Sequence, residues 1–212
     1  AVVGTRHHTD YAKLVTEKLM KDLAVQQVTV ISGLAFGVDA IAHKAAMKNG
    51  LPTVGVLAHG LDQVYPYEHT GLAKEMLKQG GGLLTEFRSG TKPDKHNFPS
   101  RNRVVAGMCD ATIVIETDIK GGSMITAELA NGYNRDVFAI PGKIMDPKSA
   151  GCNYLVRTNK AQLLSAAAEL LEIMGWEEKR VAKKEPRPQK QLFIELSEDE
   201  KKILSILQEN ES

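Results

Sequence analysis

The sequence lacks the long apolar runs, the disulfide-forming cysteines and the excess of basic residues that are typical of membrane, secreted and strongly basic proteins. No stretch approaches the roughly 18 consecutive apolar residues that a membrane span needs, and no signal-peptide pattern opens the chain. Only two cysteines occur, Cys109 and Cys152, and they make neither a disulfide framework nor a metal-ligand spacing. We therefore expect a reduced, cytoplasmic protein with no membrane contact and no metal site.

Charge is almost balanced, which limits how the chain can bind nucleic acid. Its 27 Lys and Arg residues oppose 26 Asp and Glu residues, for a net charge of +1. Any affinity for a polyanion must therefore come from a local cationic patch. With 212 residues, 42% of them hydrophobic, the chain suits one globular domain and a small appendage. It opens inside an apolar run, AVVG, without a methionine, so we expect that something upstream has been removed.

Apolar runs of strand length alternate with segments of helical spacing over most of the chain. The runs cover residues 1–3, 28–31, 53–58, 83–86, 111–116 and 136–140. Helices are predicted over residues 9–24, 38–49, 70–79 and 160–174, with one more opening at Pro99 and another at the glycine pair 121–122. Strands that are apolar throughout must be covered on both faces. The pattern therefore predicts a doubly wound α/β domain with a mostly parallel sheet.

The composition changes beyond Trp176, where we place the end of this domain, residues 1–176. Six basic residues and two prolines lie between Lys179 and Lys190, which predicts a solvated linker over residues 177–196. A capping box then precedes an apolar helical stripe. Because one amphipathic helix cannot bury its own face, residues 197–212 are interpreted as the truncated start of a small C-terminal helical domain.

Ligands of such sheets bind at the carboxyl ends of the strands, and here two of these ends lead into glycine turns. Ser32-Gly33 follows the second strand, and Gly121-Gly122-Ser123 opens the helix after the fifth. Backbone N–H groups in such turns and at helix N-termini hold phosphates. Neither a dinucleotide fingerprint nor a Walker A sequence is present. The alternative is that the turns serve packing alone.

Cationic side chains gather at the same predicted edge. Arg6 directly follows the first strand, and Lys95 lies in a basic loop ahead of the helix that Pro99 opens. Arg101 shares a helical face with the apolar residues three, four and seven positions further on, so its guanidinium should lie over the strand ends. Arg103 points to another side of this helix and is a further candidate for contact with nucleic acid. The simplest alternative for Arg6 is an ordinary surface charge.

One aromatic residue, Phe98, is interleaved with these cations. An aromatic among lysines and arginines favours stacking on a nucleic-acid base, which contributes about 1–3 kcal/mol per base and tolerates any sequence. The alternative for a single aromatic residue in a loop is that it covers the core.

Other residues that could carry chemistry have simpler explanations. Asp39 and His43 are four residues apart on one helix face, but no further ligand stands at a convincing spacing, so a helix-capping or structural pair is favoured over a metal site. Glu86, Glu116 and Glu128 have no nucleophile and base around them, and we expect solvated or salt-bridged roles for at least two. No catalytic residue and no cofactor are predicted.

Taken together, these segments resemble the DNA-processing protein A family (DprA, also called Smf). The matching segments follow the family's order: GTR at 4–6, SGLAFGVDAIAH at 32–43, KHNFPSRNRVVAG at 95–107, DATIVIE at 110–116 and GGSMITAELA at 121–130. The resemblance implies a Rossmann-like domain that binds single-stranded DNA without sequence preference. It further implies a homodimer that delivers incoming single strands to the RecA recombinase in natural transformation, and a winged helix represented here only by residues 197–212.

The resemblance also assigns roles to individual residues. Arg6, Lys95 and Phe98 match the family's DNA-contacting arginine, lysine and aromatic, and the two glycine turns match its glycine motifs. We therefore predict a protein that binds single-stranded DNA without catalysing a reaction, with Arg101 as a further phosphate contact.

Two further questions stay open on the sequence alone. A nucleotide sensor or a nucleoside-monophosphate phosphoribohydrolase is the rival function, because such Rossmann-like enzymes pair an Arg with a Glu beside a Gly-Gly loop. Arg101 with Glu116 or Glu128 could imitate that pair, although KGGSMITAE departs from the loop of those enzymes. For the dimer, residues 150–176 offer more apolar side chains than one helical stripe requires, unless they simply cover a sheet face.

Overall fold

The structure is a computed structural model that describes residues 1–176 and 198–202. The chain divides into two units after Trp176, and the first unit carries all the strands named below. In the second unit residues 198–202 are helical. The predicted linker over residues 177–196, Ser197 of the capping box and residues 203–212 lie outside the described residues.

Strands and helices alternate along the first unit, as the sequence pattern predicts. The strands are β1 (Val2–Val3), β2 (Val30–Ser32), β3 (Thr53–Val56), β4 (Gly82–Leu84), β5 (Ala111–Val114), β6 (Asp136–Ala139) and β7 (Gln162–Leu163). The helices are α1 (Asp10–Leu23), α2 (Val38–Lys48), α3 (Thr70–Lys78), α4 (Asn97–Met108), α5 (Gly122–Gly132), α6 (Ala150–Arg157) and α7 (Ala167–Ile173), with short 3-10 turns η1 (Tyr67–His69) and η2 (Pro147–Ser149).

All paired strands run parallel, in two hydrogen-bonded groups ordered β2-β3-β4 and β1-β5-β6-β7. Strands β1 and β2 lie side by side where the groups meet, and the hydroxyl of Ser32 donates a hydrogen bond to the carbonyl of Val2 at 2.6 Å. From β1 the chain first builds outward through β2, β3 and β4, and then returns to place β5 on the other side of β1. This reversal is the topological switch point at which Rossmann-like sheets bind ligands.

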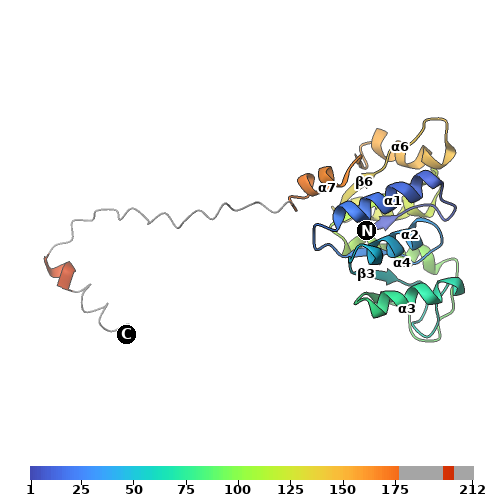
Figure 1. Ribbon diagram of the computed structural model, residues 1–212, viewed down its shortest axis with the longest axis horizontal. Coiled ribbons are helices and arrows are strands. Elements are labelled where there is room, and N and C mark those ends of the chain that lie inside the picture. Colours follow the sequence, from blue (N-terminus) through green and yellow to red (C-terminus); the bar gives the residue numbers. More distant parts are fainter. Residues whose placement is uncertain (177–197, 203–212) are drawn as a thin grey trace. The chain divides into compact units, whose positions relative to one another are not determined.

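Helices cover both faces of the sheet, which confirms the predicted doubly wound architecture. Successive strand residues point to opposite faces. Val2 and Ile113 pack in one cluster with α1, α2 and α7, whereas their neighbours Val3 and Val114 pack in another with α4, α5 and α6. Figure 1 shows α1 and α2 next to one another, with α3 beyond α2.

The prediction of one helix over residues 160–174 is wrong. That region continues from α6 through the edge strand β7 into α7. Asn159 adopts a left-handed backbone conformation (φ +56°) that ends α6, a position at which Asn is tolerated. Residues Gln162 and Leu163 then pair with β6, because hydrogen bonding at the sheet edge outweighs the helical spacing of this apolar stretch.

Helix α4 begins two residues earlier than predicted. It starts at Asn97, so Pro99 occupies the third helical position and Phe98 lies inside the helix instead of in a loop. The missing N–H of Pro99 still falls in the first turn, where backbone N–H groups have no intrahelical partner. The proline is therefore tolerated, and Phe98 is carried by a rigid element.

Candidate nucleic-acid interface

A crevice of about 660 Å³ opens at the switch point, over the carboxyl ends of β1, β2 and β5. Its walls come from the loop after β1, the turn after β2 and the N-terminal turns of α4 and α5. Among the predicted site residues, those that line it are Arg6, Gly33, Lys95, Phe98, Arg101, Gly121, Gly122 and Ser123. Ser32 and Arg103 are not among the lining residues. The fold thus brings together groups that lie more than a hundred positions apart in the chain.

Two cations and an aromatic ring form the exposed side of the crevice. The guanidinium of Arg6 lies 5.4 Å from the centre of the Phe98 ring, a cation–π arrangement. Arg6 and Lys95 are exposed, and neither forms an ion pair within the described part of the chain. Their charges are therefore available to an anionic ligand.

The glycine turn after β2 already holds a carboxylate of the protein itself. The N–H groups of Gly33 and Ala35 donate to Oδ2 of Asp39 at 3.0 and 3.3 Å. Burial raises the pKa of Asp39, against the charge of Arg101 and the hydrogen bonds, which lower it. Ser32 is fully buried and donates to β1. Two amides of this turn are therefore already bound to Asp39, although Gly33 lines the crevice, and the role of Ser32 and Gly33 in binding a ligand stays a prediction.

Arg101 forms the floor of the crevice. The side chain is 5% exposed, and its Nη1 donates to the carbonyls of Gly33, at 2.7 Å, and Val56. The guanidinium lies over the strand ends, as the helical spacing predicts. A Cβ on Gly33 would come within 2.5 Å of this guanidinium, so glycine is needed there. Burial lowers the pKa of Arg101 and the charge of Asp39 raises it. Because Nη1 is bound to two strand ends, Arg101 positions α4 and contributes only part of its donors to the crevice.

The first turn of α5 supplies the unused donors. Helix α5 begins at Gly122, and the first N–H groups of a helix have no intrahelical partner. Ser123 and Thr126 are 7% and 2% exposed, line the crevice and form no side-chain hydrogen bond within the described residues. Sequence reasoning missed Thr126; its place three residues after Ser123, on the same helical face, was the available signal.

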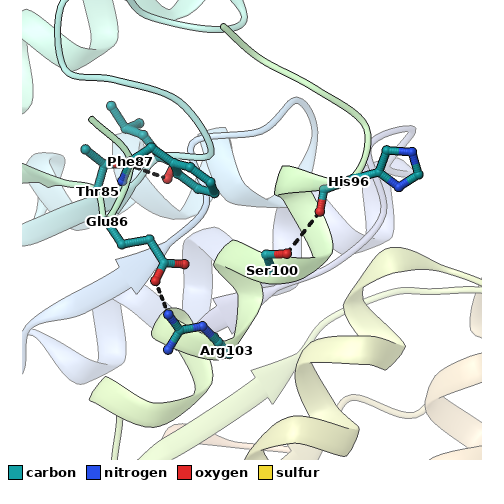
Figure 2. A network of polar contacts seen from close by, with 7 residues as sticks. Thr85, Glu86, Phe87, His96, Ser100 and Arg103 are labelled. Carbon is teal, nitrogen blue, oxygen red and sulfur yellow. Dashed lines mark hydrogen bonds and ion pairs between the residues drawn. The ribbon is translucent and has the colours of Figure 1, made fainter. Parts of the chain in front are cut away.

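Arg103 lies away from the crevice and forms an ion pair with Glu86, which follows β4 (Figure 2). Its side chain is 56% exposed. Glu128 is likewise paired, with Lys160 at 2.6 Å. The salt-bridged roles expected for two of the three glutamates are therefore confirmed, whereas the role of Arg103 in DNA binding stays a prediction.

The arrangement that the rival enzyme requires is not formed. Glu116 is buried and accepts hydrogen bonds from the N–H and the hydroxyl of Thr9, at 2.9 and 2.6 Å, at the start of α1. Glu128 faces Lys160, so Arg101 pairs with neither glutamate.

The predicted pair of Asp39 and His43 is also not formed, since His43 contacts the Thr53 hydroxyl at 2.7 Å instead. Each residue has a structural role, with separate partners. In the part of the chain that the structure describes, no cluster of three or more potential metal ligands occurs. No described helix has the length and apolarity to cross a membrane.

A parallel, doubly wound sheet with a crevice of cations, aromatic side chains and free helix N–H groups at its switch point defines a Rossmann-like protein suited to phosphate-bearing ligands. The chain belongs to the family described as DNA recombination-mediator protein A, whose model matches residues 1–175.

Relatives and solved structures agree with this membership. The chain is 40% identical to Protein Smf of Escherichia coli over 172 residues, and this alignment covers 81% of this chain and 46% of that protein. The X-ray structure of DNA processing protein A from Streptococcus pneumoniae superimposes with a TM-score of 0.75 at 39% identity, over 81% of this chain and 59% of that one. DNA processing protein A from Helicobacter pylori, whose structure is described in terms of its single-stranded DNA binding mode, gives a TM-score of 0.71 at 30% identity, over 82% and 79%. The chain spans about half the length of the curated relatives it matches.

Proposed function

We propose that this domain binds single-stranded DNA without sequence preference and acts without catalysing a reaction. The observation that carries the proposal is the convergence of Arg6, Lys95, Phe98 and the first turn of α5 on one crevice. The described binding mode of the Helicobacter pylori relative supports it.

Each group has a separate task in this proposal. Arg6 and Lys95 neutralise backbone phosphates, and the N–H groups of Gly122 and Ser123 donate to a phosphate oxygen. Phe98 stacks on one base, a contact that any base can make. Because the net charge of the chain is only +1, this local patch supplies the electrostatic attraction.

The crevice favours a single strand over a duplex. A stacking ring at the wall of a crevice can reach a base only if that base is free of its own stack and pair. A single strand offers such bases while its phosphates lie on the cations, whereas a duplex keeps its bases enclosed.

Delivery of the strand to RecA is a proposal that follows from family membership. If it holds, adding this protein should raise the initial rate at which RecA assembles on single-stranded DNA, and an Arg6→Ala protein should not. An unchanged assembly rate with the wild-type protein would count against delivery.

A homodimer is also proposed, through the segment 150–176. Much of this segment covers the sheet, since Leu155 and Leu170 are buried in its two clusters. Leu163 and Ile173 remain about half-exposed and offer a surface to a second copy. Light scattering that gives a monomer mass at micromolar concentration would refute this part.

The binding proposal is tested by fluorescence anisotropy with labelled oligo-dT and a duplex of equal length. Wild type should bind the single strand more tightly. Replacing Arg6 or Lys95 by Ala should weaken binding and flatten the log–log salt dependence by about 0.7 for each phosphate that is no longer neutralised. Arg135→Ala is the matched control. Arg135 directly precedes β6, so it lies at the amino ends of the strands and not at the carboxyl ends where the crevice opens, and it forms an ion pair with Asp110 at 3.5 Å. Equal affinity and slope for wild type and the crevice variants would refute the assignment.

A further inference from the structure

A second aromatic ring stands beside Phe98 in the crevice. Tyr65, from the long loop between β3 and α3, lines the same crevice and is 47% exposed. Its ring centre lies 5.8 Å from that of Phe98, with the two planes tilted by 45°. The loop around Tyr65 contains no lysine or arginine, so the clustering of cations in the sequence does not point to it.

The loop that carries Tyr65 is held at both ends by buried histidines. The N–H of Tyr65 donates to Nε2 of His59 at 3.2 Å, which leaves the proton of His59 on Nδ1 to donate to the carbonyl of Gly60 at 2.8 Å. At the other end, Nδ1 of His69 donates to the carbonyl of Leu34 at 2.8 Å. His59 and His69 are 1% and 7% exposed. The ring of Tyr65 is therefore presented by an anchored loop, which lowers the entropy cost of using it in binding.

The spacing of the two rings decides how bases can use them. A base held between two parallel rings needs about 7–8 Å between their centres, because stacked carbon atoms approach to about 3.5–4 Å. At 5.8 Å and 45°, Tyr65 and Phe98 are too close and too tilted to enclose one base. Each ring can instead take a base on its own open face, while Arg6 lies over Phe98.

We propose that Tyr65 is a second base-stacking residue, so that the crevice holds two neighbouring unpaired bases on a bent platform formed by Tyr65 and Phe98. The inference rests on the proposed function and narrows the ligand to strands that carry bases. A polyanion without bases would meet only the cations and the α5 donors, and would bind more weakly.

The test compares Tyr65→Ala, Tyr65→Phe and Tyr67→Ala by anisotropy, on oligo-dT and on a strand of the same length that is abasic throughout. Loss of one stacked base should weaken oligo-dT binding by about 5- to 150-fold in Tyr65→Ala. Tyr65→Phe should bind like wild type, because the ring is retained. Tyr67→Ala is the control, since Tyr67 is on the same loop, 82% exposed and not among the crevice residues. Thermal melting checks the fold, and Tyr65→Leu, which keeps apolar bulk without a flat ring, should also weaken binding.

Two readouts separate stacking from other roles. On the abasic strand, Tyr65→Ala should bind as wild type does, and its salt slope on oligo-dT should be unchanged, because the cations that neutralise the phosphates are all retained. Equally weakened binding on both strands would overturn the stacking role.

The outcomes also separate this inference from the proposed function. If wild type fails to bind oligo-dT, the proposed function fails and the inference with it. If wild type binds and Phe98→Ala weakens binding while Tyr65→Ala does not, only the inference is overturned, and Tyr65 merely covers Phe98.

Discussion

Acidification should destabilise this domain through His43, a histidine on α2 that is fully buried. Burial lowers the pKa of His43 from 6.5 to about 3, with the charges of His69 and Arg101 acting in the same direction. The hydroxyl of Thr53 donates to the carbonyl of Val30, so it accepts the proton of His43 Nδ1. Within the described residues, Nε2 of His43 is buried without a hydrogen-bond partner. The folded state therefore keeps this ring neutral.

The size of the effect follows from the two pKa values. Below pH 6.5 His43 is protonated in the unfolded chain but stays neutral in the folded chain, so the free energy of unfolding falls as the pH falls from 6.5 towards 3. At pH 5 the difference amounts to about 2 kcal/mol, taking 1.36 kcal/mol for each pH step below 6.5. Above pH 7.5 this contribution should be constant.

The assay is urea unfolding of wild type and His43→Asn between pH 5 and 7.5. Asn retains a donor for the Thr53 hydroxyl but does not titrate. Wild type should lose about 2 kcal/mol more than the variant over this range. Asp39, whose pKa burial raises, contributes with the opposite sign in both proteins and cancels in the comparison. Parallel stability curves for the two proteins would refute the reasoning, whatever the absolute cost of the substitution.

Two further predictions concern the packing of the same domain. Gly37→Ala should destabilise the fold by about 2–4 kcal/mol in urea unfolding, because Gly37 has φ +78° at the start of α2 and a Cβ there would overlap the carbonyl of Thr5. Gly50→Ala is the control, since Gly50 also has a positive φ but open space around it, and it should cost less stability. Equal losses of stability in the two variants would contradict the overlap argument. Cys152 should resist alkylation by iodoacetamide at pH 8 in the folded protein and react after unfolding, because it is fully buried and burial raises the pKa of its thiol to about 12. Peptide mass measurement locates the label. Rapid labelling of Cys152 in the native protein would contradict this prediction.

The architecture could be predicted from the sequence because local patterns report burial. Strands that are apolar throughout indicated a sheet covered on both faces, and the structure confirms this. The same patterns located the carboxyl edge with Arg6 and Lys95. They failed over residues 160–174, where the apolar spacing of a helix and that of a sheet edge followed by a helix look alike in a short segment.

Partners of individual groups could not be predicted, because they depend on which distant elements meet. Nothing near Gly33 in the sequence shows that the guanidinium of Arg101, on helix α4, donates a hydrogen bond to its carbonyl. The helical spacing places Arg101 over the strand ends, but its two carbonyl partners, those of Gly33 and Val56, depend on how α4 packs against the sheet.

The sequence by itself determined the alternation of strands and helices and the concentration of cations near one aromatic residue, since both depend on residue type and spacing. Only the tertiary structure decided which donors remain free for a ligand and that Tyr65 stands beside Phe98. The reason is physical: hydrogen-bond partners and ring neighbours are set by packing between segments far apart in the chain, which no local pattern encodes.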